Sequence, residues 1–585
     1  AIKFVFAEDA TSTDENKVYT GKATINITGG HIGIDGTDGG DVYGSARGEA
    51  GDRYTMAQYA YVNNAEVNVN FPSTASPSDI GTLTTPCITG SVHGSGENGY
   101  VYGDTKVTLN NGLIGHSLYG AGKGIGTYKK NVPILAGANK GQDKERNIYG
   151  LLSGKVLGNT LVTMNGGQVV RNVYGGGNMA SVGKGNYAGG TDDYSTGGYG
   201  ELPPSDNLAL WSNDNFLKSG RANVRVFGGT VGDQSVTANL RKVKNGLPYG
   251  NVLGGSAGEA APNIYESPRY HYCPAFFSGY VNETKVTIGG GYRCSAKCKD
   301  KYNRDYVVGE TMSIQDLKEM FEGTASLNED GTPNDSYWKA IDAPTILSSV
   351  YGGGQDGHVR RDTHVIVNGG TIGLAYNADN QSLMGIDNLD DPLWLFRGNV
   401  FGGGSGVNTY KFDFDGDDEF TSTVSYGRDA EHLVDTQEEY YSTSAGSVTR
   451  FTDVEVLGGT IHRNVYGGGS IGSVGAPKTG GQTYDPYKKG DTADGHGEGK
   501  QSQCTVTIGG AGAVTIGTPD EYQVHYGGEV YGACRGDATL NANQFGTSVW
   551  TQVFIKNGAT IMGNVFGGGD AGMVKKDTDV QIGAE

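Results

Sequence analysis

The chain has 585 residues, of which 100 are glycine and 16 are proline, and its formal net charge is −19. No strict Gly-X-Y period accompanies the glycine, and Val, Ile, Tyr and Thr occur in short alternating runs, so the composition excludes collagen and simple disorder. The negative charge opposes nucleic-acid binding, and no apolar run approaches the roughly 20 residues of a membrane span. We therefore expect an ordered, all-β chain that binds no nucleic acid and does not insert directly into a membrane.

A strand pattern of the form T-x-V-x-I, usually followed by glycines, recurs along the chain. Its apolar positions lie two residues apart, which is the period of a half-buried strand. The copies contain Ile25/Ile27, Val67/Val69, Thr105–Gly112, Thr160–Gly167, Val224/Val226, Thr284–Gly290, Thr363–Gly370, Thr452–Gly459, Val506/Val508, Val553/Ile555 and Val580/Ile582. An aliphatic residue recurs just after the glycines, at Ile32, Ile114, Val169, Val231, Ile372, Ile461 and Ile561.

A second motif, Asn172–Gly177 (NVYGGG), follows the strand pattern. Near copies stand at Ser349–Gly354, Asn399–Gly404, Asn464–Gly469 and Asn564–Gly569, and degenerate copies at Asp41–Gly44, Ser117–Gly120, Asn147–Gly150, Asn251–Gly255 and Glu529–Gly532. The shortest interval, from Tyr149 to Tyr174, is 25 residues, which fits three short strands and tight turns. We therefore predict one domain over residues 1–585, a parallel β-helix or β-solenoid of about eleven degenerate coils with long loop insertions.

The intervals between the motifs vary because long segments interrupt the repeat. We place these insertions at about 121–146, 178–222, 256–283, 291–346, 375–398, 405–447 and 470–503. One of them contains a predicted helix, which begins with a capping motif at Ser313 and ends near Gly323. A specific activity is expected in the insertions, because surface loops commonly carry function.

Asparagine recurs directly before the apolar pair of the second motif. The positions are Asn147, Asn172, Asn251, Asn399, Asn464 and Asn564. In a parallel stack, equivalent residues lie above one another, so we predict an asparagine ladder with stacked Tyr and Phe rings beside it. The alternative is that asparagine is present only because it tolerates a turn.

An acidic run offers the best candidate for ion binding. Its carboxylates belong to Asp413, Asp415, Asp417, Asp418 and Glu419. Oxygen ligands at alternate positions are typical of Ca²⁺ sites, although Asp418 replaces the glycine of an EF-hand loop and Val424 replaces its last glutamate. The alternative is a solvated acidic loop, and we expect no other cofactor.

The six cysteines are too few for a disulfide framework. For Cys294 and Cys298 we predict a local disulfide within one insertion. Free buried thiols are one alternative, and a zinc site with His271 and Cys273 is another.

The combined pattern resembles the long glycine-rich β-solenoid proteins of the cell surface of Bacteroidetes-type bacteria and, more loosely, adhesin and autotransporter-type β-helices. The resemblance covers essentially the whole chain and implies a fold and an extracellular, cell-surface location. It carries no catalytic residue. The expected function is a structural and adhesive rod with no enzymatic activity. The alternatives are a carbohydrate-active enzyme, either a polysaccharide lyase or a hydrolase, and a trimeric phage fibre.

Two kinds of partner are expected. The strand pattern at Thr578–Glu585 is followed by no capping element, so we expect the native chain to continue or a neighbouring solenoid segment or partner protein to cover this end. Tyrosines of the insertions, together with Trp338 and Trp394, could stack on sugar rings of a glycan or another cell-surface ligand. The alternative is that these rings only pack the insertions onto the rod.

Overall fold

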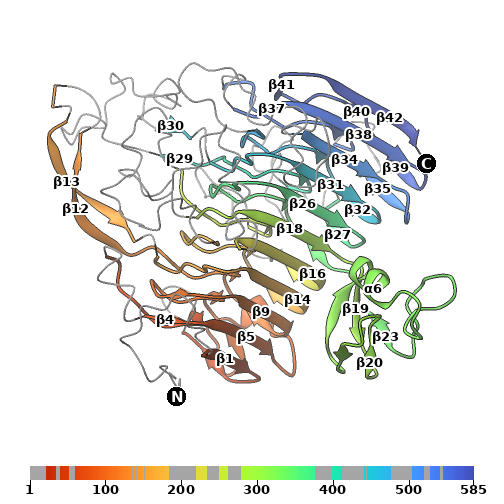
Figure 1. The fold of residues 1–585 in the computed structure, drawn as a ribbon, viewed down its shortest axis with the longest axis horizontal. Helices are drawn as coiled ribbons and strands as arrows, with labels where there is room; N and C mark the ends of the chain where they lie inside the picture. The colour runs from red at the N-terminus through yellow and green to blue at the C-terminus, as the bar shows by residue number, and fades with distance from the viewer. Residues whose placement is uncertain are drawn as a thin grey trace.

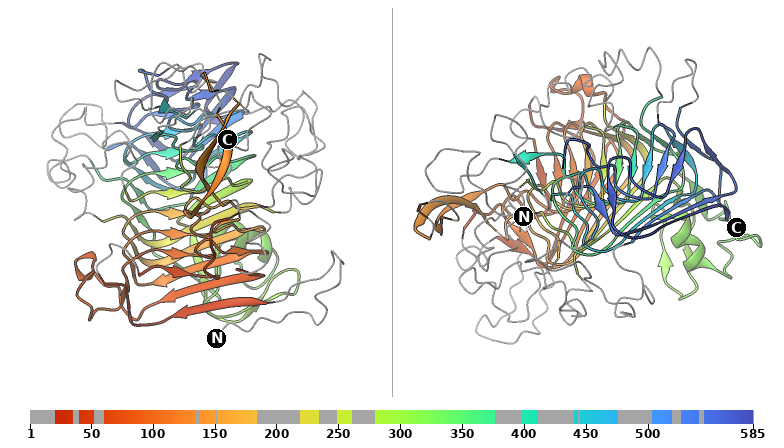
Figure 2. Two further views of the ribbon diagram at one scale, coloured as in Figure 1. Left: turned by 90° about the vertical axis from the view of Figure 1, so that its left-hand side faces the viewer. Right: turned by 90° about the horizontal axis from the view of Figure 1, so that it is seen from above.

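The computed structural model of the chain describes residues 21–34, 40–51, 60–134, 138–139, 141–150, 152–183, 219–233, 249–260, 279–375, 397–410, 440–442, 445–475, 503–518, 527–540 and 545–584. It is 43% strand and 3% helix, so the predicted all-β class is confirmed. Most strands belong to two long sheets, one of 19 and one of 10 strands. We call these two sheets together the body of the molecule (Figures 1 and 2).

The T-x-V-x-I segments form the longer strands of the 19-stranded sheet. Each pairs in parallel with its counterpart in the next repeat, so that Val224 lies between Val162 and Val286. The strands are β1 (Lys22–Ile27), β5 (Asn64–Asn70), β9 (Thr105–Asn111), β14 (Thr160–Val169), β16 (Arg221–Val231), β18 (Glu283–Ile288), β26 (Thr363–Val367), β31 (Thr452–Val456), β34 (Gln503–Ile508), β38 (Trp550–Lys556) and β42 (Thr578–Ala584). Every predicted copy of the pattern is therefore a strand.

Short strands continue this sheet after the glycine corner. They carry the predicted aliphatic residues, with Ile372 between Ile346 and Ile461. Besides the ends of β14 and β16, they are β2 (His31–Ile32), β6 (Cys87–Ile88), β10 (Leu113–Ile114), β24 (Thr345–Ile346), β27 (Thr371–Ile372), β32 (Gly459–Ile461), β35 (Val514–Ile516) and β39 (Ala559–Ile561).

The V-Y pairs form the 10-stranded sheet, which is also parallel throughout. Its strands are β3 (Val42–Tyr43), β7 (Val92–His93), β11 (Leu118–Tyr119), β15 (Val173–Tyr174), β17 (Val252–Leu253), β25 (Val350–Tyr351), β28 (Val400–Phe401), β33 (Val465–Tyr466), β36 (Val530–Tyr531) and β40 (Val565–Phe566). We call one long strand, the short strand after it and the following V-Y pair a unit.

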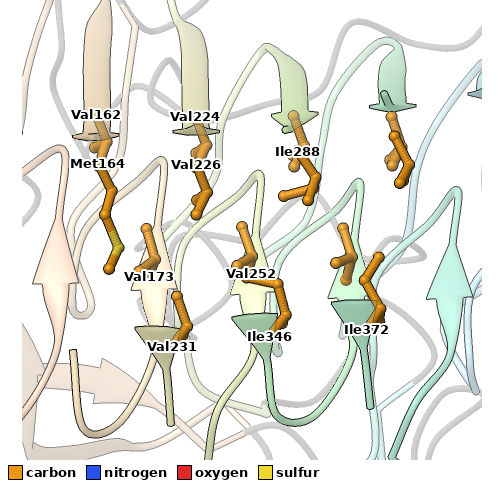
Figure 3. Packing of buried hydrophobic residues seen from close by; sticks show 14 of the residues in the cluster. Val162, Met164, Val173, Val224, Val226, Val231, Val252, Ile288, Ile346 and Ile372 are labelled. Carbon is orange, nitrogen blue, oxygen red and sulfur yellow. The ribbon is translucent and has the colours of Figure 1, made fainter. Parts of the chain in front are cut away.

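The apolar side chains of each unit meet between the two sheets. Figure 3 shows Val162 and Met164 of β14 directed toward Val173 of β15. All three side chains are fully buried, and the same cluster continues along the body from Ile27 to Ile555. Burial of each such side chain stabilises the fold by about 1.5–3 kcal/mol, so the core holds the units together along the whole body.

A third line of contacts joins the units and was not predicted. It is a series of parallel bridges that connects Val101, Val156, Val182, Val281, Val359, Val448 and Val474 in that order. Strings such as Ser181-Val182-Gly183 and Ser473-Val474-Gly475 mark this line in the sequence. The number of residues between these strings and the V-Y pair differs from unit to unit. The line of bridges therefore cannot be recognised in the sequence until the strand register is known.

The glycine after the V-Y pair is required by the close approach of the next unit. A Cβ atom added to Gly175 would lie 2.2 Å from the carbonyl oxygen of Gly254, and one added to Gly254 would lie 2.2 Å from that of Gly352. Real Cβ atoms do not approach so closely, so no other residue fits without moving the backbone. Close stacking therefore explains this glycine, whereas the left-handed conformation explains others such as Gly167, with φ of 77°.

Where a long strand begins with threonine, this residue closes the same corner. Its Oγ1 donates a hydrogen bond to the carbonyl oxygen of the glycine after the V-Y pair of its own unit. The pairs are Thr105–Gly120, Thr160–Gly175, Thr284–Gly352 and Thr452–Gly467, each at 2.6 Å, and Thr363–Gly402 and Thr551–Gly567, each at 2.5 Å.

One assignment of the second motif is wrong. Asn147 and Tyr149 belong to β13 (Asp143–Tyr149), which forms an antiparallel hairpin with β12 (Thr127–Pro133) outside the body. The 10-stranded sheet instead contains β7, which lies between β3 and β11 and ends with His93. The shortest interval between equivalent residues of this sheet is the 26 residues from His93 to Tyr119. An aromatic histidine replaces the expected tyrosine there, which is why the motif was missed.

The insertion predicted at 291–346 folds as a small subdomain beside the body, drawn in green in Figure 1. We call residues 291–341 the α6 subdomain. The predicted helix is confirmed as α6 (Ile314–Phe321), and its N-cap Ser313 accepts a hydrogen bond from the backbone N–H of Asp316 at 3.1 Å. The strands around it are β19 (Gly291–Cys294), β20 (Cys298–Lys299), β21 (Asp305–Tyr306), β22 (Thr311–Ser313) and β23 (Trp338–Ala340).

The boundaries of several predicted insertions need correction. The segment predicted at 121–146 corresponds to the β12–β13 hairpin, which begins at Thr127 and ends at Tyr149. Val182, Val281 and Val474 belong to the line of parallel bridges between units, although the ranges 178–222, 256–283 and 470–503 contain them. The remaining short elements are β4 (Tyr61–Val62), β8 (Tyr100–Val101), the 3₁₀ helix Pro77–Asp79, β29 (Thr409–Tyr410), β30 (Tyr440–Tyr441), β37 (Thr547–Ser548) and β41 (Met573–Val574).

Candidate functional site

The outward positions of the 19-stranded sheet carry the side chains that vary most from unit to unit. In each T-x-V-x-I strand the Thr, Val and Ile positions face the core and the two intervening residues face outward. The register places Lys285, His364 and Asp453 side by side in one outward column, and Glu455 in the next column. Neighbouring strands therefore bring together chemical groups that are far apart in the sequence.

His364, Asp453 and Glu455 form a cluster across β26 and β31. The Nε2 atom of His364 lies 3.8 Å from Oδ2 of Asp453 and 3.8 Å from Oε1 of Glu455. One ligand atom from each of the three residues lies within 4.8 Å of the others. Within the described ranges, this is the one group of three or more side chains of metal-binding type.

The groups around this cluster keep the Glu455 carboxyl ionised. The neighbouring His364 imidazole lowers the pKa of Glu455, and Lys285 and Lys556 lower it further. The Glu455 carboxyl is therefore ionised over the neutral range. Nε2 of His364 is covered, and the two carboxylate oxygens at 3.8 Å lie beyond ordinary hydrogen-bond distance. One imidazole nitrogen and two carboxylate oxygens could together hold a divalent metal ion.

The sequence patterns did not identify this cluster, although they contain it. His364 is in the pattern T-H-V-I-V at Thr363–Val367, and the two acids are in T-D-V-E-V at Thr452–Val456. Placing the two patterns beside each other as adjacent strands puts His364 opposite Asp453. The signal was missed because it needs the knowledge that β26 and β31 are neighbours.

The predicted calcium ligands Asp413, Asp415, Asp417, Asp418 and Glu419 lie outside the described residues, and Ca²⁺ binding there stays a prediction. His271 and Cys273, the alternative zinc ligands, lie outside them as well, as does Trp394. Trp338 is fully buried in the α6 subdomain, with its ring centroid 5.2 Å from that of Phe321. The interpretation of Trp338 as a sugar-stacking residue is therefore wrong, because the ring packs the subdomain.

The predicted disulfide between Cys294 and Cys298 is not formed in the structure, where both residues are free thiols. Sγ of Cys294 donates to the carbonyl oxygen of Ala296 at 3.1 Å. Burial, with Cys298 close by, raises the pKa of the Cys294 thiol to about 11. A thiol with so high a pKa is a poor nucleophile at neutral pH.

The predicted asparagine ladder runs through the body beside the 10-stranded sheet. Oδ1 of Asn172 accepts from the backbone N–H of Asn251 at 3.0 Å and from its Nδ2 at 3.3 Å. Oδ1 of Asn399 accepts from the backbone N–H of Asn464 at 3.3 Å, and Oδ1 of Asn464 from that of Glu529 at 3.0 Å. The ladder therefore consists mainly of side-chain oxygens that accept from backbone amides of the next unit.

The ladder differs from the prediction in its membership. Asn147 is not part of it, since it lies in the β12–β13 hairpin opposite Lys129. Asp41, Ser91, Ser117 and Ser349 take the same place in other units, as shown by the backbone N–H of Ser91 donating to Oδ1 of Asp41 at 2.7 Å and that of Asn399 to Oγ of Ser349 at 3.0 Å. For Asn564 the structure shows only the regular backbone bond of the sheet, in which its carbonyl oxygen accepts from the N–H of Val530 at 2.9 Å, so its place in the ladder stays a prediction.

The predicted stacking of aromatic rings is confirmed in the same sheet. Tyr43, His93, Tyr119 and Tyr174 follow one another with centroid distances of 4.9, 4.7 and 4.8 Å. A second stack joins Tyr351, Phe401, Tyr466, Tyr531 and Phe566 at 4.7, 4.8, 4.9 and 5.0 Å. Leu253 occupies the equivalent position between the two stacks.

Comparison of the chain with protein-family models, with curated proteins and with solved structures gives no match. In the parts of the chain that the structure describes, no helix is long and apolar enough to cross a membrane. A function for this chain therefore has to be argued from its own geometry.

Proposed function

We propose that the chain is a β-solenoid that serves as an extracellular structural and adhesive rod and displays its insertions for binding at the cell surface. The observation that carries this proposal is the parallel, in-register pairing of each described unit with the units before and after it. Such nearest-neighbour contact is the basis of a solenoid, and it produces an extended scaffold. Pairing of β42 with a neighbouring solenoid segment or a partner protein belongs to the same proposal.

The attachment of the insertions supports the adhesive part of the proposal. Tyr292 and Ala340 at the two ends of the α6 subdomain are paired residues on adjacent strands, as are Thr127 and Tyr149 at the base of the β12–β13 hairpin. Both insertions therefore leave and re-enter the body at a single point. The α6 subdomain also contacts the outer sheet face, where Arg225 Nη2 lies 3.1 Å from Asp316 Oδ2. Such fixed placement on a rigid scaffold is typical of binding loops.

The cell-surface location rests on the resemblance of the repeat to surface β-solenoids. The outward columns of the body vary in residue type from unit to unit, while the inward positions stay small or apolar, most often Thr, Val or Ile. This arrangement suits a scaffold whose core is uniform and whose surface is adapted locally.

Excision of single insertions tests the proposal. One variant replaces residues 293–339 with a short Asn-Gly turn, and a matched variant replaces residues 129–147 in the same way, since the flanking residues are already paired. The parent chain is expected to bind intact cells or immobilised plant, host or bacterial polysaccharides. Losing this binding in an excision variant that unfolds at the same temperature as the parent would support adhesion through that insertion.

Two outcomes would contradict the proposal. Release of oligosaccharides from any of these polysaccharides by the parent chain would favour the carbohydrate-active enzyme. A stable trimer in mass photometry would favour the phage fibre.

A further inference from the structure

We propose that His364, Asp453 and Glu455 form a zinc site on the outer face of the 19-stranded sheet, distinct from the insertions. The site is built from the regular body. Asp453 and Glu455 are alternate residues of β31, so their side chains leave the same face of the sheet, and His364 of β26 lies directly opposite Asp453. The strand period and the parallel register together direct the three side chains to one point.

The distances fit a site that closes around a metal ion. A tetrahedral zinc ion lies about 2.0–2.2 Å from nitrogen and oxygen ligands, so its ligand atoms are about 3.3–3.5 Å apart. Nε2 of His364 is 3.8 Å from the nearest oxygen of both carboxylates. A shift of a few tenths of an ångström brings Nε2 to zinc-binding distance from each carboxylate, and the ligand atoms of all three side chains already lie within 4.8 Å of one another.

The surroundings of Nε2 of His364 are consistent with such a site. This atom is covered by its neighbours, and the two carboxylate oxygens, each 3.8 Å away, are too far from it for a short hydrogen bond, although about a third of the side chain is exposed. A covered polar atom normally has a partner, because leaving it without one costs free energy. A metal ion between the three side chains supplies that partner.

The donor set selects the class of metal. Imidazole nitrogen favours zinc and its transition-metal neighbours, whereas Ca²⁺ and Mg²⁺ prefer sets made of oxygen alone. The three side chains are 34%, 44% and 33% exposed, so solvent reaches the site. Three protein ligands leave the fourth zinc position for water or for a donor group of a bound partner.

The competing explanation is a simple ion pair between a protonated His364 and the two carboxylates. Metal titration separates the two, because an ion pair binds no zinc. His31 and Cys87 are another pair of side chains of zinc-binding type, with Nδ1 and Sγ 3.5 Å apart. The site must therefore be assigned from the differences between variants.

The test uses the full chain, treated with a chelator and titrated with ZnCl₂ by isothermal calorimetry at neutral pH. His364→Ala is expected to lose one zinc equivalent, and Glu455→Gln to bind it at least tenfold more weakly. His462→Gln is the matched control, because His462 has a hydrogen-bond partner, Thr518 Oγ1 at 3.1 Å, and lies in another column. It is expected to match the parent.

X-ray absorption at the zinc edge provides a readout that does not depend on affinity, and a shell of nitrogen and oxygen without sulfur is expected. Unchanged zinc binding in both His364→Ala and Glu455→Gln would overturn the proposal. Displacement of the zinc by a hundredfold excess of Ca²⁺ or Mg²⁺ would overturn it as well, since it would show that the imidazole is not a ligand. Circular dichroism of the metal-free variants confirms that they remain folded.

Discussion

At the scale of single residues, Asp356 is the most unusual charge in the described part of the body. Its side chain is buried, and burial raises the pKa of the carboxyl to about 7. Oδ2 accepts from Nδ2 of Asn408, while Oδ1 has no hydrogen-bond partner. A buried carboxyl with one unpartnered oxygen is more stable in the protonated form.

This carboxyl makes stability depend on pH. The unfolded chain releases the proton near pH 4 and the folded chain near pH 7, so the folded state is stabilised at low pH and loses this contribution as the pH rises between the two values. Asp356→Asn keeps an acceptor for Asn408 and stays neutral. The stability of the variant relative to the parent is expected to increase by up to about 4 kcal/mol from pH 4 to pH 8.

Thermal unfolding of both chains across this range measures the effect. Burial lowers the pKa of His93 and of His358 to about 3, and these histidines give the opposite slope, with stability lost as the pH falls below about 6.5. Because both histidines are present in the two chains, their contribution cancels in the comparison. Parallel curves for variant and parent would show that Asp356 is ionised in the folded state throughout.

At the scale of elements, the hydroxyl of the leading threonine connects a strand to a corner. The hydrogen bond from Thr363 to the carbonyl oxygen of Gly402 ties the start of β26 to the end of the V-F pair 39 residues later. Thr363→Val keeps the shape and removes the donor, and it is expected to cost about 1–3 kcal/mol in the free energy of unfolding. Thr363→Ser keeps the donor and is expected to cost about 0.8 kcal/mol for the lost methyl group.

Thermal or chemical denaturation of the two variants gives the comparison. The serine variant serves as the control for lost volume, and it should be the more stable of the two. A valine variant as stable as the parent would mean that another group satisfies the Gly402 carbonyl.

The elements were largely predictable because their signals are local. The period of two in T-x-V-x-I and the glycines after V-Y are set by residues within one strand and one turn. The hairpin at β12–β13 was misread because Asn147 to Gly150 imitates the V-Y motif, whereas its partner strand is an antiparallel one that the motif does not contain. The line from Val101 to Val474 was missed because its spacing depends on insertions of different length.

The candidate metal cluster could not be predicted for a related reason. His364 and its two carboxylate neighbours belong to strands separated by a long insertion, and only the register makes them adjacent. The asparagine ladder, in contrast, was predicted in most of its positions because each member lies in the same motif. Its detailed chemistry was not, since serine and aspartate oxygens accept from the same backbone amides.

At the scale of the whole molecule, the body is held together by contacts between neighbouring units. We expect a destabilising substitution in one unit to lower the local stability of that unit and its direct neighbours, but not of distant units. Val454→Ala leaves a cavity in β31, with an expected cost of about 2 kcal/mol. Hydrogen exchange followed by mass spectrometry is expected to show lower protection in β26, β31 and β34 and unchanged protection in β5 and β9.

Hydrogen exchange of the same peptides from the parent chain serves as the reference. A uniform loss of protection from β1 to β42 would contradict this expectation, because it would mean that all units unfold as one cooperative block. The contacts between units would then transmit the change over the full length.

The pairing of residues at the two ends of each described insertion affects how such a chain can evolve. An insertion whose two ends are paired residues, such as Tyr292 and Ala340, can have any length. Residues can therefore be added or removed within it without shifting the register of the body. A substitution at a stacked position, in contrast, meets the same constraint from the units on both sides. Novelty in this architecture is therefore expected to arise by insertion and deletion at the corners, while the repeats themselves diverge slowly.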